Sequence, residues 1–117
     1  MIAKGSPVAV LGAGAWGTTL ARMLAGEGYS VRLWARRPEF AQQLEAEREN
    51  RQYLPGAAFP EKLRAVAELA EALADAPAVV VAVPSIGLRE AAALAAQHLQ
   101  TGALVICATK GLERPKG

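Results

Sequence analysis

The chain has 117 residues, 52% of them hydrophobic, which suits one folded domain with a packed core. Its net charge is +2 without any run of like charge, and only 5% of its residues are aromatic, which argues against a nucleic-acid-binding protein. The single cysteine excludes an internal disulfide and a cysteine-rich zinc site, and no apolar run suits a signal peptide or a membrane span, so a soluble, cytoplasmic, metal-free protein is the default expectation.

The first predicted elements are a strand over residues 8–11 and a helix over 16–26, joined by a glycine-rich turn. In this setting such a turn is typical of sites that bind the pyrophosphate of a dinucleotide, although the glycine spacing alone also occurs in ordinary loops. Gly12 is expected to permit the tight turn, Gly14 to let the backbone approach phosphate, and Gly17 to let the helix pack against the strand. The helix N-terminus would then offer free N–H groups to the anion.

Short apolar runs alternate with helical patterns along the rest of the chain. Strands are predicted over 31–34, 63–66, 78–83 and 104–107, helices over 38–50, 67–75 and 86–100, and breaks in regular structure at 53–56 and 59–60. This alternation predicts an α/β fold of the Rossmann type, a doubly wound, mostly parallel sheet with helices on both faces and right-handed crossovers. Ligands of such sheets bind at the carboxyl ends of the strands.

Arg36 and Arg37 follow the second predicted strand, where the two nicotinamide cofactors are usually distinguished. An acid there binds the ribose 2′-hydroxyl of NAD, whereas an arginine accommodates the 2′-phosphate of NADP. After this strand no acid occurs until Glu39, beyond Pro38, so NADPH is predicted to be preferred, with use of NADH left open. Each charged hydrogen bond is worth about 1.5–3 kcal/mol, or about a tenfold to hundredfold preference. The alternative is two solvated arginines at a helix start.

Three other side chains have less specific interpretations. Cys107 lies in an apolar run and is expected to be a reduced, buried thiol. His98 is expected on the surface of the last helix. Trp34 is expected in the core rather than beside an adenine ring.

Several motifs in order along nearly the whole chain resemble those of bacterial NAD(P)-dependent glycerol-3-phosphate dehydrogenases. Glycine turns and Val-Pro-Ser elements occur in many dehydrogenases, whereas Tyr-Leu-Pro-Gly and Ala-Thr-Lys-Gly-Leu-Glu are much more specific to this family. The matching segments are 10–18, 33–36, 50–56, 83–85 and 108–113.

The resemblance implies reduction of dihydroxyacetone phosphate to sn-glycerol 3-phosphate for phospholipid synthesis, with hydride from NADPH or NADH. It implies cofactor contacts from Ala15, which replaces a commoner serine, and from Trp16 and Tyr53, in addition to the turn glycines and both arginines. Pro84 and Ser85, which follow a predicted strand, are expected to line the nicotinamide side. Lys110 would touch both cofactor and substrate. An ammonium group at a strand's carboxyl end could polarise a ketone and stabilise the developing alkoxide.

The resemblance also implies that the family's C-terminal substrate domain is absent from residues 1–117, which would form the dinucleotide-binding domain alone. The family's proton-donating lysine is then expected beyond Gly117, and the chain by itself is expected to be inactive. The alternatives are another Rossmann dehydrogenase and a stand-alone NADPH-sensing module. A homodimer is a further expectation.

Overall fold

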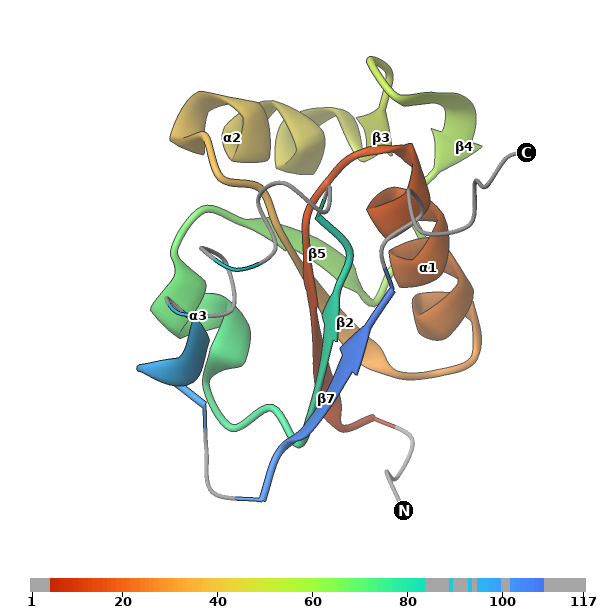
Figure 1. Cartoon of the computed structure of the whole chain (residues 1–117). Coiled ribbons are helices and arrows are strands. Elements are labelled where there is room, and N and C mark those ends of the chain that lie inside the picture. The colour runs from red at the N-terminus through yellow and green to blue at the C-terminus, as the bar shows by residue number, and fades with distance from the viewer. Residues whose placement is uncertain (1–4, 84–88, 90–92, 94, 100–101, 109–117) are drawn as a thin grey trace, which may run out of the picture.

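A five-stranded parallel sheet with the order β5-β2-β1-β6-β7 organises the chain (Figure 1). The structure, a computed structural model, describes residues 5–83, 89, 93, 95–99 and 102–108. The strands of the sheet are β1 Pro7–Leu11, β2 Ser30–Trp34, β5 Leu63–Val66, β6 Ala78–Val81 and β7 Leu104–Cys107, and the helices are α1 Ala15–Gly26, α2 Pro38–Glu47 and α3 Leu69–Leu73. This order and the parallel pairing confirm the predicted Rossmann-type fold.

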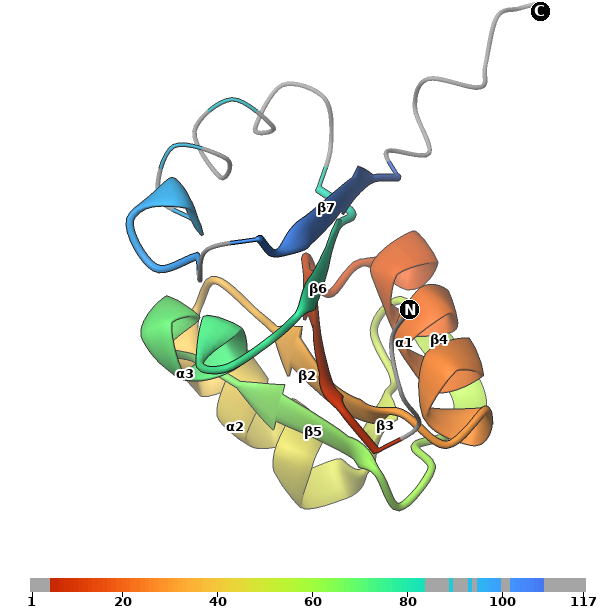
Figure 2. The ribbon, with the colours of Figure 1, turned by 90° about the horizontal axis from the view of Figure 1, so that it is seen from below.

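Helices cover both faces of the sheet, which explains why its inner strands are almost continuously apolar. Val8 and Val10 face the core that α1 and α2 cover, while Ala9 and Leu11 face the core that α3 covers. In Figure 2 the sheet separates α1 from α3. A strand buried on both faces has no position for a solvated side chain, so the usual alternation of polar and apolar residues is lost.

The carboxyl ends of the strands meet at one edge of the sheet. Leu11 pairs with Trp34 on one side and with Val81 on the other. The hydrogen bonds continue beyond the strands, from the Gly12 N–H to the Trp34 carbonyl at 3.0 Å and from the Ala82 N–H to the Leu11 carbonyl at 2.8 Å. The segments that leave this edge therefore begin side by side.

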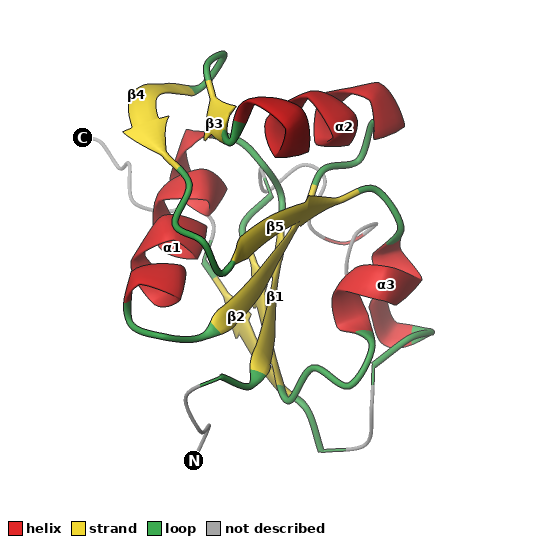
Figure 3. Cartoon of the chain, turned by 180° about the vertical axis from the view of Figure 1, so that it is seen from behind, coloured by secondary structure: helices red, strands yellow, loops and turns green. Residues whose placement is uncertain are grey.

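A second, two-stranded sheet occupies a region where no strand was predicted. The helix predicted over 38–50 ends at Glu47, because Arg48 adopts a left-handed conformation with φ of 54°. Strand β3 Glu49–Asn50 then pairs antiparallel with β4 Leu54–Ala58 beside α1 (Figure 3). The predicted break at 53–56 was thus wrong, since the proline and glycine of β4 fit a short strand outside the main sheet.

Two predicted elements are shorter than expected. The 67–75 helix is reduced to α3, because Glu68 and Ala74 have extended or non-helical backbone angles. Strand β6 ends at Val81 rather than at residue 83. The helix predicted over 86–100 lies largely outside the described residues.

Of the three side chains predicted from their surroundings, two are placed as expected and one is not. His98 is exposed, and Trp34 is buried with its indole Nε1 donating to the Ala67 carbonyl at 3.0 Å. The prediction of a buried Cys107 was wrong, because its thiol is exposed. Its strand, β7, pairs only with β6 and forms the outer strand of the described sheet, and all four of its residues are exposed. Among the described helices, none has the length and apolarity needed to cross a bilayer.

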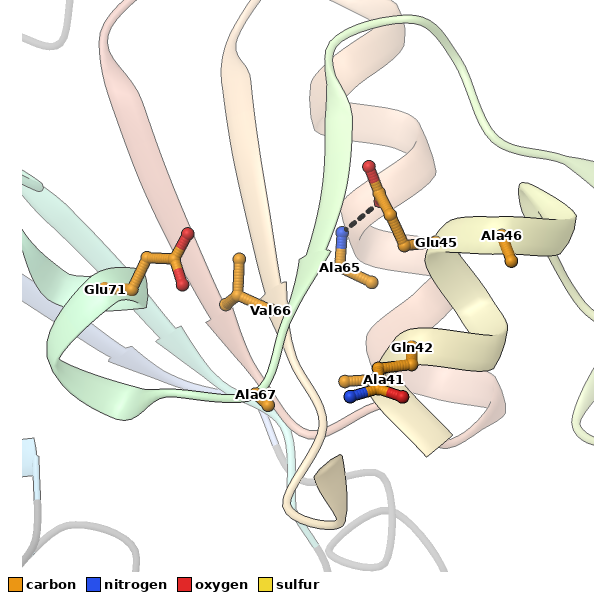
Figure 4. Close-up of a pocket in the computed structure, with 8 residues that line it drawn as sticks. All are labelled: Ala41, Gln42, Glu45, Ala46, Ala65, Val66, Ala67 and Glu71. Atoms are coloured by element: carbon orange, nitrogen blue, oxygen red, sulfur yellow. Dashed lines mark hydrogen bonds between the residues drawn. The ribbon is translucent and has the colours of Figure 1, made fainter. Parts of the chain in front are cut away.

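Glu45 of α2 covers the free edge of β5, the outer strand at the other end of the sheet (Figure 4). One carboxylate oxygen accepts the outward N–H of Ala65 at 2.9 Å, and the other accepts from Arg64 Nε at 2.8 Å. The carboxylate thus occupies a position that an added strand would need, and an exposed sheet edge is a template for such pairing.

Replacing Glu45 with alanine should lower the free energy of unfolding by about 1–2 kcal/mol, because the part-buried Ala65 N–H loses its acceptor. Glutamine keeps an acceptor oxygen and should lose less. Urea unfolding measures both effects, and sedimentation velocity reports any association through the uncovered edge. Gln42→Ala is the control, because Gln42 is exposed on the same helix. A Glu45→Ala variant as stable as this control would show that the bond from the Ala65 N–H does not stabilise the fold.

Candidate functional site

The glycine turn is built so tightly that two of its three glycines cannot carry a side chain. Gly12 has φ of +116°, and a Cβ there would lie 2.6 Å from the Ala82 carbonyl oxygen. A Cβ on Gly17 would lie 1.9 Å from the Gly12 carbonyl oxygen. Both obstacles are backbone atoms, which cannot rotate away as a flexible side chain could. The backbone of the turn therefore packs directly against the start of α1 and against the residue that follows β6.

Gly14 differs, because a Cβ there would meet no atom of the described residues within 4 Å. It is the N-cap of α1, with an extended backbone, and it brings no capping side chain. The first hydrogen bond of the helix runs from the Thr18 N–H to the Gly14 carbonyl at 3.0 Å, so the N–H groups of Ala15, Trp16 and Gly17 precede it. Within the described residues, the space beside Gly14, the N–H groups without a partner inside the helix and a first turn without acidic residues together suit a phosphate group.

Ala15 and Trp16, both predicted to contact a cofactor, lie at this helix start. Ala15 is exposed, and its carbonyl accepts from Thr19 Oγ1 at 2.8 Å. Trp16 is half-buried and packs against the core beneath α1 and α2. Trp16 therefore fixes the first turn of the helix on the sheet, and Ala15 faces outward beside Gly14.

Arg36 and Arg37 leave the same edge of the sheet, directly after β2, and both are exposed. The Arg37 guanidinium lies over the Phe40 ring, 5.6 Å from its centroid. The Phe40 ring in turn meets the Tyr53 ring edge-on, with centroids 5.9 Å apart. Arg37 and Tyr53 thus both contact the Phe40 ring. Each was predicted on its own grounds to contact the cofactor.

Asn50 contacts the glycine turn, and the sequence interpretation did not single it out. It is completely buried, and its Nδ2 donates to the Ala13 carbonyl and to Thr18 Oγ1, both at 2.9 Å. Its Oδ1 accepts the Tyr53 N–H at 3.1 Å. The signal available in the sequence was its place at the start of the family-like segment 50–56, but an asparagine in a predicted helix gave no indication of these partners.

Three predicted site residues, Pro84, Ser85 and Lys110, lie outside the described residues, so their predictions stay untested. The strands that precede them, β6 and β7, end at the carboxyl edge together with the glycine turn. In the part of the chain that the structure describes, no cluster of three histidine, cysteine, aspartate or glutamate residues could hold a metal ion.

A family model described as "NAD-dependent glycerol-3-phosphate dehydrogenase N-terminus" matches residues 7–117. The chain belongs to this family. It is 53% identical over 110 residues to the glycerol-3-phosphate dehydrogenase [NAD(P)+] of Chlorobium limicola, an alignment that covers 94% of this chain and 33% of the relative. The chain thus spans about a third of the length of the curated relatives that it matches.

Solved structures agree with this family membership. The glycerol-3-phosphate dehydrogenase of Coxiella burnetii superimposes with a TM-score of 0.86 at 35% identity, over 90% of this chain and 32% of the other. The glycerol-3-phosphate dehydrogenase of Saccharomyces cerevisiae superimposes with a TM-score of 0.80 at 26% identity, over 92% of this chain and 34% of the other. The resemblance stated from the sequence motifs is therefore confirmed.

Proposed function

We propose that residues 1–117 form the dinucleotide-binding part of an enzyme that reduces dihydroxyacetone phosphate to sn-glycerol 3-phosphate, a precursor of phospholipids. One observation carries the proposal: among the described residues, Gly14 leaves space beside N–H groups that have no partner inside the helix, at the N-terminus of α1 and the carboxyl edge of a parallel sheet. Family membership points to NADPH or NADH as the ligand. The bound cofactor would supply the hydride.

The residues of this chain would then have separate tasks. The N–H groups at the start of α1 would hold the pyrophosphate, where a helix N-terminus favours negative charge. Arg36 and Arg37 would pair with the 2′-phosphate of NADPH, and the contact with Phe40 would restrict the motion of Arg37 before binding. Lys110 would place its ammonium group beside the ketone, by analogy with the family.

Replacing Arg36 with alanine should weaken NADPH binding about tenfold to hundredfold, because a hydrogen bond to a charged phosphate is lost. NADH binding should change little, since NADH lacks the 2′-phosphate. Parallel titrations of both cofactors, read by nicotinamide fluorescence, measure the ratio. Arg51→Ala is the matched control. The Arg51 side chain is 65% exposed, and the residue lies in the connection between β3 and β4 rather than at the carboxyl edge of the main sheet.

Two outcomes, one of these titrations and one of an activity assay, would contradict the proposal. An unchanged NADPH-to-NADH ratio in the Arg36→Ala variant would show that this arginine does not read the 2′-phosphate. NADPH binding by the full-length gene product without oxidation of NADPH by dihydroxyacetone phosphate would favour the alternative of a sensing module. The cytoplasmic location and the homodimer stay predictions.

A further inference from the structure

The Asn50 side chain joins two parts of the molecule that are distant in sequence. Burial of an amide is costly unless its polar atoms are paired, and Asn50, which has no solvent exposure, uses both Nδ2 hydrogens and its Oδ1. Its orientation is fixed by these partners, because exchanging nitrogen and oxygen would place Oδ1 against the Ala13 carbonyl oxygen. Asn50 thus has a single satisfied arrangement.

This arrangement determines which way the glycine turn presents its backbone. The Ala13 carbonyl points toward Asn50, at 2.9 Å. In a trans peptide, the carbonyl and the following N–H point in opposite directions, so the Gly14 N–H points away from Asn50. A flip of this peptide would turn a carbonyl oxygen toward an incoming anion, and the hydrogen bond from Asn50 opposes that flip.

The other end of the amide holds the backbone of Tyr53. The Tyr53 ring contacts Phe40, and Phe40 lies beneath the Arg37 guanidinium. A continuous set of contacts therefore runs from the glycine turn through Asn50 to the arginine that follows β2.

We propose that Asn50 is a positioning residue for the dinucleotide: its Nδ2 orients the Ala13–Gly14 peptide toward the pyrophosphate, and its Oδ1 holds Tyr53 beside the 2′-phosphate end. The inference rests on the proposed function. It assigns to Asn50 no direct contact with ligand, because the side chain is buried behind the turn.

Asn50→Asp tests the bond from Nδ2 to Ala13 separately from the bond that Oδ1 accepts from Tyr53. The aspartate is nearly isosteric and still accepts the Tyr53 N–H, but in its ionised form it has no hydrogen to donate to the Ala13 carbonyl. NADPH affinity of the full-length gene product should fall at least tenfold, whereas adenosine 2′-monophosphate, which lacks the pyrophosphate, should bind within twofold of wild type. Calorimetric titration well below the unfolding temperature of each variant measures both constants.

Two further variants complete the test. Thr18→Val removes another bond of the same amide without freeing the Ala13 carbonyl, so it should lower stability but leave NADPH affinity within about threefold. If Asn50→Asp does not fold, Asn50→Ser, whose hydroxyl is too short to reach Ala13, carries the same expectation of a tenfold loss.

The outcomes distinguish this inference from the proposed function. Wild-type protein that binds neither NADPH nor adenosine 2′-monophosphate would refute the proposed function. Wild-type protein that binds both, with a folded Asn50→Asp or Asn50→Ser variant that binds NADPH equally well, would overturn only the role of Asn50. A parallel loss of both ligands in Asn50→Asp would also overturn it, because a merely structural defect does not select the pyrophosphate.

Discussion

Alanine in place of Gly17 should destabilise the fold by about 2–3 kcal/mol, although alanine is the better helix former by about 1 kcal/mol. The added methyl would lie 1.9 Å from the Gly12 carbonyl oxygen and 3.0 Å from the Gly12 carbonyl carbon. Gly12 has little room to shift, because it lies close to the Ala82 backbone: a Cβ on Gly12 would lie 2.6 Å from the Ala82 carbonyl oxygen. Helix α1 must therefore move away from the turn, which separates its N-terminus from the strand ends and should abolish NADPH binding as well.

Gly26→Ala is the matched control for this variant. Gly26 is the last residue of the same helix, and a Cβ there would meet no atom of the residues that the structure describes within 4 Å. Thermal unfolding should show a fall of roughly 10–20 °C for Gly17→Ala and no fall for Gly26→Ala, given about 4–8 °C per kcal/mol in a small domain. Equal unfolding temperatures for the two variants would show that the turn accommodates a methyl group at position 17, contrary to the short Cβ distances.

The features that were predicted correctly depend on local sequence. The Gly12–Gly17 spacing requires a strand before it and a helix after it, and both occur. The strands of the main sheet were recognised because a strand buried on both faces is an uninterrupted run of apolar residues in the sequence. From these two facts the parallel sheet and the common carboxyl edge follow.

The features that were missed depend on contacts distant in sequence. Arg48 ends α2 in a left-handed conformation, held by its bonds to Glu45 and to the Pro60 carbonyl, and no local breaker marks that position. Cys107 looks like a core residue because its neighbours are apolar, but its exposure is decided by what packs on β7. Asn50 acquires its role only when β3 is folded against the glycine turn.

Serine in place of Gly14 should leave the protein as stable as before or more stable by a few tenths of a kcal/mol, because serine is among the best N-cap residues and glycine is only moderately good. The extended backbone of Gly14 accepts any residue, and the space beside it is open. Urea unfolding tests this half of the prediction.

The same substitution should weaken NADPH binding about tenfold to hundredfold, since a capping hydroxyl competes with the phosphate for the N–H groups of Trp16 and Gly17. Gly14→Ala adds the methyl without the capping oxygen, so it should lose affinity by filling the cradle but gain no stability. Loss of binding together with gain of stability cannot arise from partial unfolding, and it would therefore locate the pyrophosphate at this turn. A Gly14→Ser variant that binds NADPH as tightly as wild type would mean that the free donors of α1 are not the anion site, which would remove the observation that carries the proposed function.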